Sequence, residues 1–391
     1  MGWTAIRDAL LLLALAPFSY YLLAIIAARR FFRDSGNAVS ADFTPAISIL
    51  KPIRGLDREA YENFASFCRQ DFPEFEIIFC VTDESEPAIS AIREIIQDFE
   101  RQDSPKRTLR LLVGSEAVGI SDKVNKLCRM AREARHDLVL ISDSDVRVEP
   151  GFLRAVAAPF RDPTVGGVTC LYRGLADGSL PATLEALGNS TDFAAGVLAA
   201  RALGGLDFML GAVMATTKQH LAEIGGFESL ADYLCDDYEL GNRIALRGHR
   251  IELNSFPVSV VYPRETLSQA FRHQIRWNLA VRWSRPAGHF GLLFSQGLPW
   301  AIVAAAIAPS IAISAAYLAV YAILRVGVAW IVGACGMRDS SVQRNLWLLP
   351  LRDAFAFIVW LASFFPQRIH WRNQEFLVRD KRLVPIVPRQ R

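Results

Sequence analysis

The feature that most constrains this chain is an uncharged apolar run near its start, Ala9–Ala28. A helix of that length spans the hydrocarbon core of a bilayer. A signal peptide is the alternative, but the run lacks a basic leader and a clean small-residue cleavage site. Arg29, Arg30 and Arg33 follow directly, and positive charge marks the cytosolic side of a membrane segment. We therefore predict a transmembrane anchor over residues 1–36 and a cytosolic chain after it.

Composition supports a membrane protein and gives no support for a nucleic-acid partner. Hydrophobic residues make up 52% of the 391 residues and gather at both ends, whereas the net charge is only +3. The cysteines show no CxxC or Cys/His spacing, so we expect free, buried thiols in a reducing compartment. They are Cys68, Cys80, Cys128, Cys170, Cys235 and Cys335. For Cys235, which lies beside two acids, a reactive thiol is the alternative.

Short apolar segments alternate with helix-competent ones in the middle of the chain. The segments AISILKP, FEIIFCVTD, RTLRLLVG and HDLVLISDSD have the length and composition of buried strands. This alternation predicts a mostly parallel sheet covered by helices on both faces. We assign residues 45–267 to this Rossmann-like α/β domain. Its ligands are expected at the carboxyl ends of the strands, where acidic residues fall.

The last part of the chain returns to apolar sequence. We expect an amphipathic interfacial helix at residues 268–290 and membrane helices over residues 291–367. Leu298–Gly336 contains a single charge, Arg325, and is too long for one span. We predict two helices there that meet near Ser314.

The segment LWLLPLRDAFAFIVWLASFF is harder to place because it carries Arg352 and Asp353. Charges at mid-membrane are unfavourable, so this segment spans the bilayer, dips into it or lies at its surface. The basic tail, residues 368–391, favours a cytosolic C-terminus. A cytosolic tail requires an even number of C-terminal crossings, which argues against three full spans.

Two aspartates follow the predicted strand in LVLISDSDVRVEPGFL. Asp143 and Asp145 are two residues apart, so both can approach one cation, and Mg²⁺ or Mn²⁺ prefers carboxylate and phosphate oxygens. The alternative is an ordinary polar loop ahead of a helix, because a lone DxD is common. The pair is therefore a candidate metal site that needs support from other motifs.

Polar residues also stand at the end of another predicted strand and at the start of a predicted helix. Asp83 ends the predicted strand of EIIFCVTDESEPAI, where it either contacts a nucleotide or forms a turn. Lys123 and Lys126 lie in GISDKVNKL at the start of a predicted helix. A cation and backbone N–H groups there can hold phosphate, and a solvated lysine pair is the alternative.

Two late motifs complete the candidate residues. Asp236 and Asp237 open a predicted helix, where acids are electrostatically favourable, and the functional alternative is a general base. The helix LSQAFRHQIRWNLAVRWSRP carries the arginines and tryptophans typical of a membrane interface. Alternatively, His273, Arg276 and Trp277 close over an active site and bind a diphosphate.

The motif order KP…VTD…DKVNKL…DSD…GGF…DDY…HQIRW resembles the inverting GT-A glycosyltransferases. It is most similar to the ceramide glucosyltransferase family, including bacterial hopanoid-biosynthesis-associated glycosyltransferases. The resemblance covers residues 45–290, the anchor and the apolar C-terminus. It implies a GT-A fold, a Mg²⁺ or Mn²⁺ ion at Asp143 and Asp145, and a catalytic base at Asp237.

The same resemblance implies a nucleotide site. Asp83 matches the residue that contacts uridine, and Lys123 matches a nucleotide contact. Asp143 of the metal motif, and Lys51 of the KP pair, complete the predicted nucleotide-binding set.

The closing motif departs from the family pattern. Many relatives have Gln or Arg, two variable residues and then Arg-Trp, whereas this chain has His273 at the first position. Arg276 and Trp277 match the motif, and either His273 or Gln274 takes the role of its first residue. In the tail, WRN stands where relatives often have WRG.

The resemblance implies a multi-pass membrane enzyme with a cytosolic catalytic domain, at the inner membrane in a bacterium. It would transfer glucose from UDP-glucose to the primary hydroxyl of a ceramide-type lipid and give a β-glycoside. The alternative is GlcNAc transfer from UDP-GlcNAc to a diacylglycerol or hopanoid-pathway lipid. The partners are then a UDP-sugar, a lipid acceptor and the bilayer. We expect acceptor contacts in a loop at Gly174–Met209. A processive synthase, a binding module without activity and a transporter are the less favoured classes.

Overall fold

The computed structural model describes residues 2–34, 43–101, 107–365, 369–371 and 374–386. The chain forms two compact units. An α/β unit contains residues 35–176, 205–263 and 376–391, and a helical unit contains residues 1–34, 177–204 and 264–375. The predicted basic tail lies partly outside the described residues, at 387–391, and the WRN motif lies partly outside them at 372–373.

The α/β unit is built on four parallel strands that the sequence predicts. They are β1 (Ile47–Pro52), β2 (Phe75–Val81), β3 (Arg107–Val113) and β4 (Leu138–Ser142), adjacent in the order β3-β2-β1-β4. Every residue of β1, β2 and β4 is buried. Strands buried on both faces read as continuous apolar runs, and this explains why β1, β2 and β4 were recognisable in the sequence, whereas β3 is only partly buried.

The second half of the sheet is mixed. Its strands are β7 (Val213–Thr217), β6 (Val165–Leu175), β8 (Arg250–Val261) and β5 (Val146–Arg147), adjacent to β4 in the order β4-β7-β6-β8-β5. Neighbours β4/β7, β7/β6 and β8/β5 are antiparallel, whereas β6/β8 is parallel. Parallel pairs therefore outnumber antiparallel ones, and the predicted mostly parallel α/β sheet is confirmed.

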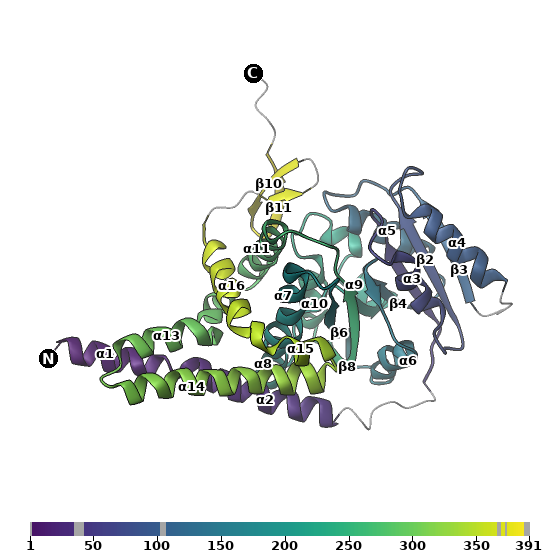
Figure 1. Ribbon diagram of the computed structural model, residues 1–391. Helices are drawn as coiled ribbons and strands as arrows, with labels where there is room; N and C mark the ends of the chain where they lie inside the picture. Colours follow the sequence, from purple (N-terminus) through teal and green to yellow (C-terminus); the bar gives the residue numbers. More distant parts are fainter. Residues whose placement is uncertain (1, 35–42, 102–106, 366–368, 372–373, 387–391) are drawn as a thin grey trace, which may run out of the picture. The chain divides into compact units, whose positions relative to one another are not determined.

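Helices pack beside this sheet (Figure 1). They are α3 (Ala60–Cys68), α4 (Ile89–Glu100), α5 (Asp122–Glu133), α6 (Phe152–Ala157), α9 (Lys218–Glu223) and α10 (Asp236–Leu246). Ser121 caps α5 by accepting a hydrogen bond from the backbone N–H of Val124 at 3.4 Å.

A C-terminal hairpin, which the sequence reading did not predict, completes the α/β unit. Strands β10 (Gln374–Arg379) and β11 (Arg382–Pro385) pair antiparallel. The backbone N–H of Leu234 donates to the carbonyl of Lys381 at 3.0 Å, and that of Leu383 donates to the carbonyl of Asp232 at 2.9 Å. The hairpin thus supports the loop that precedes α10.

The helical unit contains the predicted anchor. Helices α1 (Gly2–Leu13) and α2 (Ala16–Asp34) are joined by a turn, and together they form one candidate membrane span, Gly2–Asp34. Helix α14 (Ile311–Val328), continued by a π-helical segment to Gly336, is the second candidate. Helices α2, α13 (Gly297–Ile307) and α14 pack against one another (Figure 1).

A bent helix pair offers a third crossing. Pro286–Ser295 and Gly297–Ile307 meet at 51° and together have the length and apolar composition of a broken span. The predicted helix boundary near Ser314 is wrong, because α13 ends at Ile307 and α14 begins at Ile311. Pro309 explains the true position, since proline disfavours helical conformation in the residue before it and has no N–H to donate.

The segment predicted as a loop at Gly174–Met209 is mostly helical. It contains α7 (Leu180–Gly188), a π-helical turn (Asn189–Phe193) and α8 (Ala194–Gly204). Its alanine and leucine content gives high helix propensity, which outweighs the scattered glycines that suggested a loop. Helix α8 packs against α2, so this segment belongs with the helical unit.

Helix α16 (Leu349–Ala362) forms most of the segment LWLLPLRDAFAFIVWLASFF, which the sequence left as spanning the bilayer, dipping into it or lying at its surface. Its 14 residues fall short of the roughly 20 that a spanning helix needs. Arg352 and Asp353 are both buried, and each has a charged partner within the helical unit. Asp353 accepts from Arg325 at 2.9 Å, and Arg352 donates to Asp192 at 3.1 Å.

All six cysteines are free, as predicted. Four are buried and Cys235 is partly buried. Cys335 is exposed, contrary to the expectation of buried thiols, because it lies on the outer face of the helical segment that ends the second candidate span.

Candidate active site

The loop of Asp143 and Asp145 is held in place from the neighbouring strand. Lys51, at the end of β1, donates to the carbonyl of Asp143 at 2.9 Å and to the hydroxyl of Ser142 at 3.2 Å. Its ammonium also lies 3.9 Å from the ring centroid of Phe67. Burial lowers the pKa of Lys51 to about 7, and the two aspartates oppose this shift. The contacts make Lys51 a support for the loop, and its nucleotide-binding role stays a prediction.

Three carboxylates gather at this edge of the sheet. Burial raises the pKa of Asp145 to about 7, and the charges of Asp143 and Asp57 add to the effect. Burial likewise raises the pKa of Asp57, whose Oδ2 atom has no hydrogen-bond partner among the described residues. Crowded carboxylates with an unpaired oxygen favour a divalent cation, and the Mg²⁺ or Mn²⁺ ion at Asp143 and Asp145 stays a prediction.

Asp57 is the member of this group that sequence reasoning missed. It lies in the loop after β1, within KPIRGLD. The available signal was its position after the carboxyl end of a parallel strand, where ligands gather in such sheets. No motif marked it, because its neighbours Asp143 and Asp145 come from a distant part of the sequence.

Lys123 joins the two acidic pairs. From the start of α5, its ammonium lies 2.8 Å from Asp143 Oδ1 and 3.7 Å from Asp236 Oδ2. Burial alone would lower the pKa of Lys123, but the two carboxylates outweigh it and hold this pKa above its ordinary value. Lys126 is different, because it is buried and donates to the carbonyl of Ile53 at 2.6 Å. The alternative of a solvated lysine pair is therefore wrong. Of the two lysines, only Lys123 lies against Asp143 and Asp236.

Asp237 occupies a confined position at the start of α10. Its Oδ1 atom accepts from the backbone N–H of Tyr238 at 2.8 Å and from the thiol of Cys235 at 3.0 Å. A Cβ at Gly211 would lie 2.9 Å from Asp237 Oδ2, so a side chain there would displace this carboxylate. Burial and then Asp236 raise the pKa of Asp237, while Lys123 opposes them. A raised pKa makes a carboxylate a better proton acceptor near neutral pH.

Cys235 shows the properties of an unreactive thiol. Burial and the Asp237 charge raise the pKa of Cys235 well above its usual value, so the thiolate does not form at neutral pH. Its role is to donate a hydrogen bond to Asp237.

Asp83 lies exposed after β2 and forms a turn. Its Oδ1 atom accepts from the backbone N–H of Ser85 at 2.8 Å and from the Ser85 hydroxyl. These bonds hold the pKa of Asp83 below its usual value. Asp83 thus forms the turn that was one of its two predicted roles. The other role, contact with a nucleotide, stays a prediction.

The HQIRW motif lies on α11 (Leu267–Ser284) in the helical unit. A capping box starts this helix, because Thr266 accepts from the Gln269 N–H while the Gln269 side chain accepts from the Thr266 N–H. The ring of His273 lies 4.5 Å, between centroids, from that of Trp277, one turn along the helix. Arg276 is exposed and Gln274 is buried. His273 is thus the member of the uncertain pair beside Trp277.

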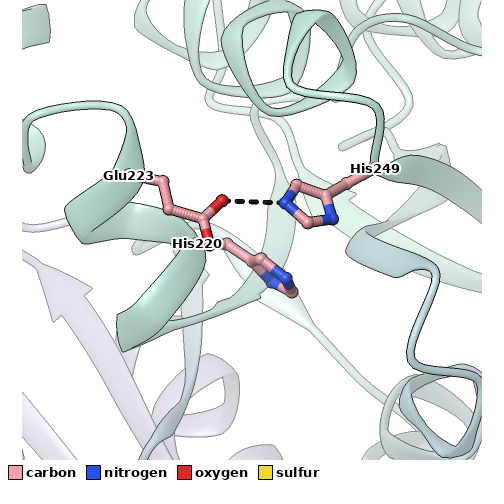
Figure 2. Close-up of side chains that lie close together, drawn as sticks. All are labelled: His220, Glu223 and His249. Atoms are coloured by element: carbon pink, nitrogen blue, oxygen red, sulfur yellow. Dashed lines mark hydrogen bonds and ion pairs between the residues drawn. The ribbon is translucent and has the colours of Figure 1, made fainter.

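A separate group of two histidines and a glutamate lies elsewhere in the α/β unit (Figure 2). His249 Nε2 lies 2.8 Å from Glu223 Oε2, and His220 Nδ1 lies 3.0 Å from the Thr217 hydroxyl. The His220 and His249 rings lie 4.2 Å apart between centroids. Ordinary hydrogen bonds and ring contact account for this group, and it contains none of the sequence-predicted residues.

The sheet with acidic loops at its strand ends has the fold of the GT-A glycosyltransferases. A solved structure, the mannosyltransferase PcManGT from Pyrobaculum calidifontis in complex with GDP-Man and Mn²⁺, has a TM-score of 0.55 and 18% identity. The alignment covers 92% of this chain and 99% of that one.

The family follows from a match over nearly the whole chain. The family model for glycosyl transferase family 21 matches residues 9–384, and the chain belongs to that family. Ceramide glucosyltransferase 1 of Caenorhabditis elegans is 29% identical over 264 residues, which are 66% of this chain and 54% of that protein. The ceramide glucosyltransferase of Gibberella zeae is 28% identical over 156 residues, 39% of this chain and 29% of that protein. The chain thus spans about half the length of the Caenorhabditis relative.

Proposed function

We propose that this protein is a membrane-bound inverting glycosyltransferase that moves glucose from UDP-glucose to the primary hydroxyl of a ceramide-type lipid. The observation that carries the proposal is the bridge made by Lys123, which links the Asp143 loop to the Asp236–Asp237 helix start. The residues proposed to hold the cation and the half-buried residue proposed as the base thereby lie at one edge of one sheet. The family and the names of its relatives support the substrate class.

On the donor side, Asp143 and Asp145, with Asp57 beside them, would hold a Mg²⁺ or Mn²⁺ ion. When bound, the ion supplies positive charge to the diphosphate of the leaving UDP. Lys123 provides a fixed ammonium for the nucleotide, and Asp83 is assigned to the uridine as the family resemblance implies. The Mn²⁺ and GDP-Man of the mannosyltransferase structure are consistent with this donor chemistry.

On the acceptor side, Asp237 removes the proton of the lipid hydroxyl. The resulting oxygen attacks the anomeric carbon, and the bond to the UDP oxygen breaks with its electrons leaving on UDP. A single displacement inverts an α-linked donor to a β-glycoside. We assign Arg276 to the departing diphosphate and Trp277 to the same motif, following the resemblance.

The membrane topology that fits these segments has one N-terminal crossing and two C-terminal ones. The bent pair Pro286–Ile307 and the helix Ile311–Gly336 supply the latter two, while α16 is too short to add a third. Two crossings after the α/β unit return the chain to the cytosolic side. This agrees with the positive charge after the anchor and in the tail.

The direct test is sugar transfer in membranes that contain the full chain. Radiolabelled UDP-glucose and UDP-GlcNAc are each offered with ceramide and with diacylglycerol, with and without Mn²⁺. We expect metal-dependent labelling of ceramide from UDP-glucose. Labelling of diacylglycerol from UDP-GlcNAc would replace the substrate assignment and keep the mechanism. UDP binding without transfer to any lipid would contradict the enzymatic proposal.

Asp57→Asn tests the three-carboxylate cation site. Removing one negative charge is expected to raise the Mn²⁺ concentration needed for half-maximal transfer about 10- to 100-fold. The measurement is a Mn²⁺ titration of initial rates at saturating donor. Glu59→Gln is the matched control, because Glu59 is a surface acid in the same loop that pairs with Arg58 and Arg147. An unchanged titration in Asp57→Asn would remove Asp57 from the site.

A further inference from the structure

A second group of acidic and imidazole side chains lies in the helical unit, away from the Asp143 loop in the sequence. We call it the Glu185 cluster, and it consists of Glu185, Glu265 and His273. Glu185 lies on α7, Glu265 directly before α11 and His273 two turns into α11. Helices α7 and α11 pack against each other, so the cluster lies where two helices meet.

The three ligand-type atoms of this cluster converge without satisfying one another. Glu185 Oε1, Glu265 Oε2 and His273 Nδ1 all lie within 4.8 Å of one another. Each is buried, and none has a hydrogen bond of acceptable geometry to any described residue. The closest pair, His273 Nδ1 and Glu185 Oε1, is 3.0 Å apart.

The burial of Glu185 makes this arrangement unfavourable as it stands. Its side chain is only 3% exposed. A buried carboxylate needs donors or a cation, because taking its charge out of water is otherwise opposed by several kcal/mol. Glu265 adds a second carboxylate to the same space rather than a donor. The two carboxylates therefore share one imidazole, which is positively charged only when protonated, and the Arg276 charge acts on Glu265 from nearby. A divalent cation would neutralise both carboxylates without requiring that proton.

We propose that the Glu185 cluster binds one divalent transition-metal ion of the Zn²⁺ or Mn²⁺ class, with Glu185, Glu265 and His273 as its ligands. One imidazole nitrogen with two carboxylate oxygens is a ligand set that these ions accept. Ligand bonds of about 2.0–2.1 Å place neighbouring tetrahedral ligand atoms roughly 3.3 Å apart. The 3.0 Å pair is close to that spacing, and the Glu265 oxygen, which lies within 4.8 Å of both atoms, would have to move closer on binding.

This site differs from both other acidic groups in the chain. The Asp143 loop offers carboxylates only, and its ion is expected to bind together with the nucleotide. The His220 group has its imidazole and carboxylate atoms engaged in hydrogen bonds at 2.8–3.0 Å. Only in the Glu185 cluster, within the part of the chain that the structure describes, do three metal-ligand atoms meet with none of them in a hydrogen bond.

The proposed ion would fix the motif helix to α7. Because the His273 ring lies against Trp277, a ligand bond to His273 also restrains that tryptophan. The site thus acts as a clamp that positions the HQIRW motif. This consequence for activity rests on the proposed function, whereas metal binding itself does not.

The test uses the full chain purified in detergent, with Asp143→Asn and Asp145→Asn introduced to remove the other cation site. After chelation, the protein is titrated with Zn²⁺, and bound metal is counted after desalting. A parallel Co²⁺ titration reports the ligand field by visible absorption. We expect a single tightly held ion, a Co²⁺ spectrum typical of nitrogen and oxygen ligands, and a rise in melting temperature on Zn²⁺ addition.

His273→Gln, Glu185→Gln and Glu265→Gln should each abolish tight binding and the Zn²⁺-dependent rise in melting temperature. His273→Gln keeps a polar side chain of similar reach, so an unchanged metal-free melting temperature shows that it folds. His249→Ala is the matched control and should bind as the parent does. The proposal is overturned if no Zn²⁺ is retained, if His273→Gln retains it, or if His249→Ala loses it. Failure of lipid glycosylation in the wild-type chain, with intact Zn²⁺ binding in the tested variant, would contradict only the proposed function.

Discussion

Asp237→Asn is expected to lower kcat for lipid glycosylation about 10²- to 10⁴-fold, the usual contribution of a positioned general base. The amide keeps the size of the side chain and cannot accept the acceptor proton. Because Asp237 is not assigned to the nucleotide, the affinity for UDP should stay unchanged. Initial rates at saturating donor, combined with UDP binding by calorimetry, separate the two effects. Glu223→Gln, a carboxylate of the His220 group, is the control and should leave kcat unchanged.

The pH dependence of the wild-type enzyme gives an independent check of the same residue. Burial raises the pKa of Asp237, so the active carboxylate form is lost as the pH falls through that raised value. The Cys235 thiol opposes the rise by donating to Asp237. Cys235→Ala should therefore move the acidic limb of the kcat profile to higher pH. A limb that does not move, or a kcat in Asp237→Asn close to wild type, would remove Asp237 from the role of base.

The elements predicted correctly from sequence are those whose signals are local. Three of the four predicted strands were recognisable because burial on both faces makes them continuous apolar runs. The helix at Asp236 was recognisable from acids at a favourable N-terminus. Alternation of these elements was enough to predict the α/β fold, because parallel strands require crossover helices.

The parts that escaped prediction depend on distant partners. Asp57 joins Asp143 and Asp145 only when β1 and β4 pair. Arg352 and Asp353 looked like unpaired charges that disfavour a membrane segment. Their partners Asp192 and Arg325 are remote in sequence and could not be recognised from it. The Gly174–Met209 segment was expected to be a loop, whereas it forms α7 and α8, and α8 packs against the distant helix α2. Single-sequence patterns contain no information on such pairings.

The buried charges of the helical unit give the largest expected effect on stability. Arg325 is 2% exposed, and its guanidinium donates to Asp353 at 2.9 Å and to Asp192 at 2.6 Å. The Tyr321 hydroxyl donates to Asp353 at 2.7 Å. These bonds join α14 to α16 and to the π-helical turn after α7. Every carboxylate in the group depends on an arginine for its neutralisation.

Arg325→Met is expected to reduce the free energy of unfolding by about 3–5 kcal/mol, because it leaves the buried Asp353 without its cation. Asp192 is less affected, since Arg352 also donates to it at 3.1 Å. The measurement is unfolding of the detergent-purified chain followed by helical circular dichroism during titration with denaturant. Arg29→Met, at an exposed position on α2, is the control and should change stability by less than about 0.5 kcal/mol.

The double variant Arg325→Met/Asp353→Leu distinguishes two causes of lost stability, an unpaired buried carboxylate and the loss of side-chain packing. Removing both partners leaves no uncompensated carboxylate at position 353, so much of the lost stability should return. If the double variant is as unstable as Arg325→Met alone, the penalty comes from the volume and shape of the arginine rather than from the buried charge. If Arg325→Met itself behaves as Arg29→Met does, the ion pair is not part of what holds α14 and α16 together.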